Sequence, residues 1–528
     1  MKMVKSLFLG SAAGLVAMGG AQAADLPVKA KAVEYVKVCS LYGAGFYYIP
    51  GTDTCLKLGG YLRVEMAVNT NSVNLGNISG QGGAKNRYTN AFSARSREQI
   101  DIDTRTATEY GVVRTFAQLA GTWSDDSYSS NANTFGTVYS LIPGSNPSLA
   151  APNNANAGQA GLGQIGLYQA FIQFAGFTMG KAFSQFTAPW ASYPGNNFDG
   201  LVGSASTVTG VNQFTYTAEF GNGVSAAISA QDPTNYFQPG VNNIPISAAT
   251  GLPTGAAGPF GASAYAGTSV PDLIGMVRVD QAWGLFQAAV AAHNNHVAYY
   301  NTTQETSGHP NDLWGYAGQV SLSIKNIPTG PGDTINVSAV YTNAANRYNI
   351  NEFAAPNAGG AAIYGTTGLP GAYQSVGFGT TVDTVFANNG GSQQRISTWG
   401  FNGAYTHNWN PYWNTAIYGA YASINYSGGA KALVCGNGVV GGSFQAFYGA
   451  GVISCNPDYN IAQAGIIVRW TPVKNLTFSA DFTYQHLDQK MTGTVVVPNG
   501  GPVGKPALVY ELRDQNNVLA LLRAQRTF

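Results

Sequence analysis

After its first two dozen residues, the 528-residue sequence contains no apolar run long enough to form a transmembrane helix. Such a helix needs about 20 consecutive apolar residues, so helical membrane spans are excluded from the rest of the chain. Charge is also scarce, because charged residues make up 10% of the sequence. Basic and acidic residues nearly balance at 26 against 25, so the net charge indicates no particular class of partner.

Residue patterns that support catalysis or metal binding are few. The chain has five histidines and no C-x-x-C motif. His293 and His296 have a spacing found in metal sites, but we expect both in a solvated loop, where no helix would align their rings. Glycine pairs lack the strand-to-helix context of a phosphate-binding loop, and no basic patch contains the interleaved aromatics of a nucleic-acid surface. The sequence therefore predicts neither an enzyme nor a protein that binds a cofactor, a metal or nucleic acid.

The first 23 residues have the features of a secretory signal peptide. Two lysines precede an apolar run at residues 7–18, and an A-x-A cleavage site follows at residues 21–23. A membrane anchor is the alternative, but the apolar run is too short to span a bilayer. We therefore expect cleavage before Ala24 and an exported mature chain.

Glycine and tyrosine are abundant, with 67 and 30 residues. This composition is typical of an all-β chain with many turns and aromatic girdles. A secreted β-solenoid or an array of β-sandwiches shares it, so composition alone leaves these architectures open.

Residues 95–123 show the β pattern most clearly. Charged and amide side chains occupy alternate positions on both sides of a short turn near Glu109, and small or apolar residues fill most of the gaps. A period of two indicates β-strands. Each run is long enough, at roughly 9 to 11 residues, to cross a bilayer as part of a barrel. The charged face would then line water, and the other face would contact lipid or protein.

The same unit repeats along the chain, with long and short connections in alternation. We expect long connections at residues 70–93, 124–163, 183–210, 232–271, 293–312, 344–394, 425–458 and 488–509. Short turns are expected near Glu109, Gly176, Gly221, Ala282, Pro328, Pro411 and Pro472. These connections join sixteen strands, which is the pattern of an outer-membrane barrel.

The predicted fold is therefore all-β, a 16-stranded antiparallel transmembrane β-barrel at residues 56–528. Closure of the barrel leaves no unpaired strand edge in lipid. An N-terminal segment on the periplasmic side, residues 24–55, is expected to precede it.

The four cysteines fall into two local pairs, Cys39 with Cys55 and Cys435 with Cys455. Three pairings are possible in an oxidising compartment. Proximity favours the two local disulfides, each closing a loop of about 15 to 20 residues and stabilising the fold by roughly 3 kcal/mol. An even number of strands places both chain ends on the periplasmic side, so the second pair is expected in an external loop.

Three motifs resemble the general porins of alphaproteobacteria. They are Ala24-Asp25-Leu26-Pro27, the segment from Tyr42-Gly43-Ala44-Gly45-Phe46 through Pro50-Gly51-Thr52-Asp53-Thr54-Cys55 to Arg63, and the closing Leu522-Arg523-Ala524-Gln525-Arg526-Thr527-Phe528. The resemblance covers essentially the whole chain and is most specific at its two ends. It implies a homotrimer of barrels in the outer membrane that passes small hydrophilic solutes and ions. It also implies that the third external loop folds into the lumen.

By this resemblance, residues 183–210 form the inward-folded constriction loop. Their core at residues 190–202 is unusually aromatic for a loop in water, and such side chains need cover. The lumen wall can supply that cover. Asp199 is the only charged residue of this connection.

The inward faces of the first three strands carry Arg63, Arg97 and Arg114. Together with Asp199 they are the predicted pore constriction. Opposite charges across a narrow pore would create a transverse field that orients dipolar solutes and sets ion preference. Alternatively, the arginines neutralise the carboxylates of neighbouring strands, namely Glu65, Asp101 and Asp103.

Passive diffusion through a water-filled pore is the predicted function, because a barrel of 16 strands is wide enough for an aqueous channel. An outer-membrane barrel enzyme, which would need a base beside a nucleophile, and a secreted β-rich adhesin are the alternatives. Trimer contacts are expected where outward-facing residues are too polar or small for lipid. These residues are Ser96, Glu98, Thr104, Thr106, Thr115, Ala117 and Gly121.

Overall fold

The computed structural model describes most of the chain from residue 37 onward. The described residues are 37–70, 92–124, 164–191, 193–198, 201–205, 209–233, 240–301, 303, 305–350, 362–365, 375–436, 441–449, 451–496 and 508–528. The expected signal peptide lies outside them, and so does Asp199. Both therefore stay predictions.

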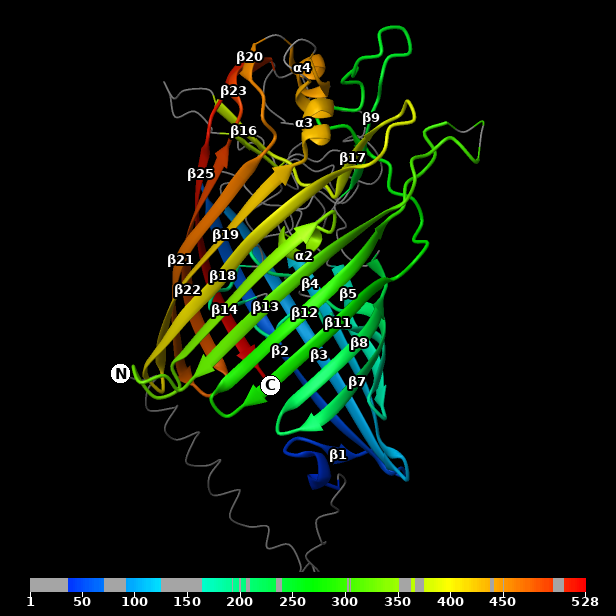
Figure 1. Cartoon of the computed structure of the whole chain (residues 1–528). Helices are drawn as coiled ribbons and strands as arrows, with labels where there is room; N and C mark the ends of the chain where they lie inside the picture. Colours follow the sequence, from blue (N-terminus) through cyan, green and yellow to red (C-terminus); the bar gives the residue numbers. More distant parts are fainter. Residues whose placement is uncertain are drawn as a thin grey trace, which may run out of the picture.

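A closed ring of antiparallel strands forms the body of the molecule (Figure 1). Within the described residues it contains sixteen strands, which confirms the predicted fold class. In chain order they are β2 (Thr54–Asn69), β3 (Phe92–Thr108), β4 (Gly111–Ser124), β5 (Gln164–Phe174), β6 (Phe177–Ala182), β7 (Val211–Gly221), β8 (Val224–Gln231), β11 (Asp272–Gln281), β12 (Gly284–Asn295), β13 (Leu313–Lys325), β14 (Thr334–Asn343), β18 (Gln394–Asn410), β19 (Trp413–Tyr426), β21 (Tyr459–Val473), β22 (Leu476–Gln489) and β25 (Gln515–Thr527).

The ring closes where the first barrel strand pairs with the last. Strand β2 pairs with β25 from Tyr61 opposite Thr527 to Asn69 opposite Leu519. The backbones of Gly60 and Phe528 exchange two further hydrogen bonds of 3.2 and 3.0 Å. This closure satisfies the backbone groups that an open edge would expose to lipid.

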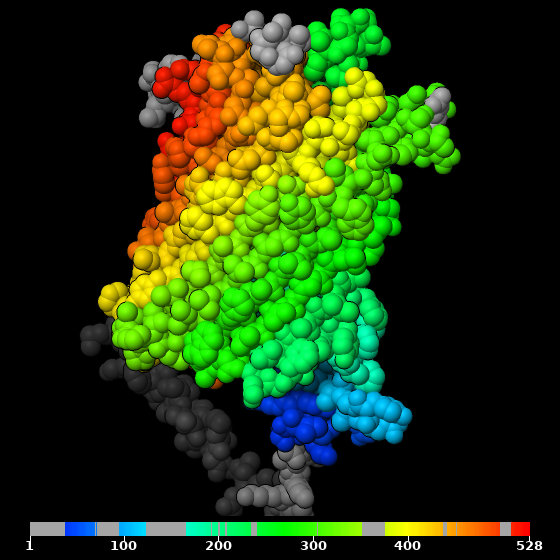
Figure 2. All heavy atoms as spheres, viewed as in Figure 1, coloured from blue at the N-terminus to red at the C-terminus, as the bar shows by residue number. Residues whose placement is uncertain are grey.

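Along strands such as β22, apolar side chains face outward and polar side chains face inward. On β22, Phe478 and Phe482 are exposed, whereas the alternate residues Ser479, Asp481 and Thr483 are buried. Such alternation suits a wall between hydrocarbon and an aqueous interior. The space-filling view shows neighbouring strands as slanted, continuous bands of this wall (Figure 2).

Short turns join the strands at one end of the barrel, and long connections join them at the other (Figure 1). Strands β3 and β4, for example, are separated by Glu109 and Tyr110 alone. The turn expected near Pro472 falls slightly later, at Lys474 and Asn475 between β21 and β22. The pairing register of these two strands is irregular between Trp470 and Val473, which accommodates the proline near the strand end.

The long connections build a second layer above the barrel. A five-stranded sheet there consists of β15 (Ala362–Gly365), β16 (Ser375–Gly379), β24 (Val509–Leu512), β23 (Thr492–Val496) and β20 (Val452–Ser454). Strands β9 (Val241–Ile244), β10 (Ala262–Ser263) and β17 (Thr384–Ala387) join the edge of the main sheet. Helices α3 (Gly428–Cys435) and α4 (Ser443–Tyr448) belong to this layer, whereas the short helix α2 (Arg347–Ile350) packs against the barrel strands β14 and β18. An aromatic cluster that includes Phe260, Phe378, Phe444 and Tyr448 packs the layer together.

No helix among the described residues is long and apolar enough to cross a membrane.

Two disulfides lie at opposite ends of the molecule and match the local pairing expected from the sequence. Cys39–Cys55 closes the segment that contains a 3-10 helix (Ser40–Tyr42) and β1 (Tyr47–Tyr48). Cys435–Cys455 connects the end of α3 to the residue after β20. In Figure 1, β1 lies at the end with the short turns, and α3 lies at the other end.

Candidate functional site

The described residues between 183 and 205 (183–191, 193–198 and 201–205), which we call the inner segment, lie against the inner face of the barrel wall. Their backbone N–H groups donate to inward-facing side chains of three strands. Asn197 donates to Asp481 (2.7 Å), Val202 to Gln463 (3.0 Å) and Ala205 to Gln319 (3.0 Å). These acceptors stand on β22, β21 and β13, and each is buried. The segment therefore spans a wide part of the interior wall.

Side chains of the same wall also donate to backbone carbonyls of the inner segment. Arg469 donates to Gly195 (3.0 Å), Arg523 to Asn197 (3.0 Å) and Asn336 to Pro194 (3.0 Å). A segment without regular secondary structure needs such partners, because its buried backbone groups would otherwise be unsatisfied. The inward arginines and amides of β14, β21 and β25 thus fix the path of the inner segment.

A cavity of about 520 Å³ remains between the inner segment and the opposite wall. It is lined by Tyr61, Arg63, Arg97, Gln99, Gln118, Tyr168, Gln169, Phe171, Gln173, Thr178, Ala182, Phe183, Ser184, Gln185, Thr187, Ala188, Pro189, Tyr193 and Arg278. We call it the lumen cavity. Its described lining contains three arginines and no carboxylate, so the side chains that line it carry a net positive charge.

Two of the three predicted arginines line this cavity. Arg63 donates to Gln525 at 2.8 Å, and its guanidinium lies 4.4 Å from the centroid of the Tyr61 ring. Arg97 donates to Thr122 at 3.0 Å, and its guanidinium lies 5.5 Å from the Tyr168 ring. Attraction between a cation and a ring face holds each guanidinium near the wall.

Arg114 is arranged differently and fits the alternative given above, in which an arginine neutralises a carboxylate on a neighbouring strand. It does not belong to the lining of the lumen cavity. Its guanidinium forms an ion pair with Asp103 across β3 and β4, at 3.0 Å. Asp103 also pairs with Arg105 at 3.1 Å. Cross-strand neutralisation therefore accounts for Arg114.

Glu65 is neutralised by two arginines that the sequence did not single out. Its buried carboxylate pairs with Arg95 on β3 and with Arg523 on β25. The remaining expected carboxylate, Asp101, accepts hydrogen bonds from Gln99 and Gln118. The arginines of the lumen cavity are thus not the main partners of these acids.

Arg278 on β11 is a lining residue that the sequence pattern concealed. The inward positions of β11 include Ile274 and Met276 as well as Arg278. Because these inward residues are as apolar as the outward ones, alternation of polarity is weak in this strand. The alternate spacing from Asp272 was the only signal that could have indicated an inward arginine.

The expectation that His293 is a solvated loop residue is wrong. His293 lies within β12 and is fully buried, because this strand continues past its expected end. Its ring contacts Asp272, whereas the ring of His296 contacts Asp312 in a more exposed position. The two histidines therefore do not share a partner. Among the described residues, no group of three potential ligands is close enough to hold a metal ion.

A closed antiparallel barrel with an apolar outer face and a polar interior defines a transmembrane β-barrel of the outer-membrane type. The model of the Porin subfamily matches residues 25–521. The chain belongs to this family and is an outer-membrane protein.

Relatives with known names agree with this assignment. The chain is 31% identical over 303 residues to porin Omp2b of Brucella suis biovar 1, which covers 54% of this chain and 65% of the relative. It is 34% identical over 235 residues to porin Omp2a of Brucella ovis, covering 43% and 59%. The chain thus spans less than two thirds of the length of these relatives.

A solved structure supports the fold alone. The outer membrane channel DcaP of Acinetobacter baumannii aligns with a TM-score of 0.52 at 13% identity, covering 91% of this chain and 99% of that one.

Proposed function

We propose that this protein is a passive, water-filled channel for small hydrophilic solutes and ions. The observation that carries the proposal is the lumen cavity, enclosed by a complete barrel wall and lined mostly by charged, amide and hydroxyl side chains. A barrel of this strand number is wide enough for an aqueous path. A polar lining lets solutes cross the membrane without leaving water. Their passage by diffusion then needs no chemical step and no energy source.

Purified protein in a planar lipid bilayer tests this function. We expect stepwise increases in conductance without any added substrate or energy source. An enzyme or an adhesin with the same barrel would insert without producing such currents. A correctly folded protein that inserts and yet conducts no ions would contradict the proposal.

We further propose that Arg63 and Arg97 bias the channel toward anions. Both lie in the lumen cavity, whose described lining adds a third positive charge from Arg278. Arg63→Ala or Arg97→Ala should lower the anion-to-cation permeability ratio by up to about thirtyfold, because a unit charge 4 Å from an ion in water favours an anion and disfavours a cation by about 1 kcal/mol each. Reversal potentials in a salt gradient measure this ratio.

Arg114→Ala is the matched control for this experiment. It removes the same charge from the same wall, but from an ion pair with Asp103 outside the cavity. Its effect should be clearly smaller. Equal shifts of the reversal potential in Arg114→Ala and Arg63→Ala would contradict the proposal that ions pass through the lumen cavity beside Arg63. Asp199→Asn is expected to move selectivity toward anions if Asp199 faces the same passage.

We also propose that three copies assemble through the outer faces of β3 and β4. Ser96 and Glu98 are exposed on the outer face of β3, and Thr104 is hydrogen-bonded to Thr115 on that face. Elsewhere the exposed outer residues include Phe482 and Leu522. Polar groups that face hydrocarbon without partners are costly, so a neighbouring subunit would relieve this cost. Gel electrophoresis without boiling should show a band of three chains, and a stable, fully conducting monomer would refute the proposal.

A further inference from the structure

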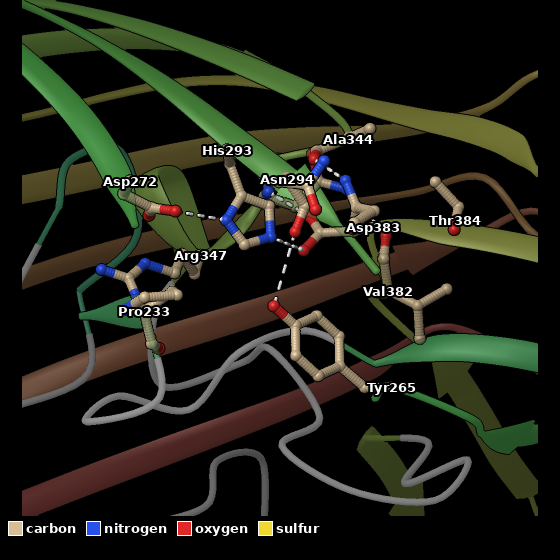
Figure 3. Close-up of polar contacts among 12 residues, drawn as sticks. Pro233, Tyr265, Asp272, His293, Asn294, Ala344, Arg347, Val382, Asp383 and Thr384 are labelled. Atoms are coloured by element: carbon tan, nitrogen blue, oxygen red, sulfur yellow. Dashed lines mark hydrogen bonds and ion pairs between the residues drawn. The ribbon is translucent and has the colours of Figure 1, made fainter. Parts of the chain in front are cut away.

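A buried cluster of two aspartates and one histidine lies where the barrel wall meets the long connection after β14 (Figure 3). The Nδ1 atom of His293 on β12 is 2.7 Å from Oδ1 of Asp272 on β11. On the other side of the ring, Nε2 is 3.8 Å from Oδ2 of Asp383, which precedes β17. We call these three residues the Asp–His–Asp cluster.

The cluster holds the short helix α2 against the wall. The Tyr348 hydroxyl donates to Asp272 at 2.5 Å, and the backbone N–H of Asn346 donates to Asp383 at 2.5 Å. Arg347 donates to the carbonyl of Pro233 at 3.0 Å. Both carboxylates of the cluster therefore accept hydrogen bonds from α2 or from the residue just before it.

Helix α2 in turn contacts the inner segment of the lumen. The backbone N–H of Gly203 donates to the backbone oxygen and to the side-chain oxygen of Asn349, at 3.1 and 3.0 Å. The ring of Phe186 lies 4.6 Å from that of Tyr348. A continuous chain of contacts therefore links His293 in the wall to the segment that borders the lumen cavity.

The charges around His293 make this chain of contacts sensitive to protons. The charged and titratable groups that face the ring are Asp272 on β11, Asp383 before β17, and Arg347 and Tyr348 on α2. Nε2 of His293 and Oδ2 of Asp383 face each other, and neither has a hydrogen-bond partner among the described residues. A proton on either atom gives the pair one donor and one acceptor, which makes their close approach favourable.

Burial raises the pKa of Asp383 to about 6, although His293 and the Asn346 N–H oppose the increase. If α2 moves away and Asp383 meets water, its pKa returns to about 4. Asp383 therefore holds its proton more tightly in the closed arrangement. At a pH between about 4 and about 6, opening makes Asp383 release this proton. The closed arrangement is most stable below about pH 4 and loses this contribution as the pH rises through about 6.

We propose that the Asp–His–Asp cluster is a proton-dependent contact that positions α2 and, through it, the inner segment of the channel. Acid keeps α2 against the inner segment, and a rise in pH releases α2 and its contacts with Phe186 and Gly203. The consequence for ion flow rests on the proposed channel function, but the movement of α2 does not. One titrating proton changes the opening equilibrium by at most tenfold per pH unit, and with these two pKa values the expected change between pH 4 and pH 6 is about 25-fold.

Hydrogen exchange of residues 344–350 in the full-length protein tests the movement directly. Wild-type protein should show increasing opening of this stretch from pH 4 to pH 6, after correction for the intrinsic exchange rate. Asp383→Asn keeps an oxygen for the Asn346 N–H and presents an N–H toward His293, as the protonated acid does. This variant should stay closed across the range.

His296→Gln is the matched control, because it removes a histidine that pairs with Asp312 in a more exposed position outside the cluster. It should keep the wild-type response. Wild-type opening that does not depend on pH, or an unchanged response in Asp383→Asn, would overturn the proposal. Single-channel recordings should show more current fluctuations as the pH rises. Absence of any conductance would count against the channel function alone, whereas conduction with pH-independent exchange would count against the cluster alone.

Discussion

Replacing Glu65 by glutamine should lower the free energy of unfolding by about 3 to 5 kcal/mol, the cost of removing one partner from a buried ion pair. Its carboxylate is buried between Arg95 and Arg523. Without that charge, two guanidinium groups remain buried together. Because Glu65 and Arg523 belong to the strands that close the ring, the loss falls on the closure of the barrel. Denaturant titration of the protein in detergent, followed by gel mobility, measures it.

Asp103→Asn provides the control for this prediction. Asp103 also pairs with two arginines, Arg105 and Arg114, but their side chains are 30% and 28% exposed. Ion pairs that water can reach contribute about 0 to 1 kcal/mol, so this variant should lose little stability. Equal losses of unfolding free energy in the two variants would show that the burial of Glu65 does not determine its contribution to stability.

Gly203→Ala should displace the inner segment and change the single-channel current. Gly203 has a φ of +90°, and a Cβ atom there would lie 2.2 Å from the backbone carbon and oxygen of Phe401. The left-handed backbone alone costs an L-residue roughly 1 to 3 kcal/mol, and backbone on a barrel strand cannot easily move aside. We expect a larger or more variable conductance than in wild type, because the segment can no longer lie against β18.

Gly267→Ala tests whether this effect is specific. Nothing lies within 4 Å of a Cβ atom at Gly267, and its backbone does not have a positive φ. Its single-channel current should match that of the wild type. If Gly203→Ala gives the same current as Gly267→Ala, the inner segment does not border the conducting path.

The barrel itself could be predicted from the sequence because its signals are local. Alternation of polarity and turn residues recur in each strand, as in β22, where apolar Phe478 and Phe482 alternate with Ser479 and Asp481. Strand number then follows from counting connections. Strand β19 pairs with both neighbours over most of its length.

The interior arrangement could not be predicted, because it depends on which distant side chains meet. Nothing local indicates that Glu65 pairs with Arg523, or that Asp272, His293 and Asp383 form one cluster. Local sequence also does not indicate which arginines line the cavity and which form ion pairs. Arg63 and Arg114 have similar sequence surroundings, yet Arg63 lines the lumen cavity and Arg114 pairs with Asp103. The five-stranded sheet above the barrel could not be predicted either, because its short strands lie within connections that carry no repeated pattern.

We propose that ions cross the membrane between the inner segment and the wall that carries Arg63 and Arg97. Modification of introduced cysteines during current recording tests it most directly, because the described native cysteines are all paired. Gln118 lines the lumen cavity, whereas Ser321 is buried on the inner face of β13, away from that lining. A bulky thiol reagent should permanently reduce the current of Gln118→Cys and leave that of Ser321→Cys unchanged. Block of Ser321→Cys with no effect on Gln118→Cys would contradict the account.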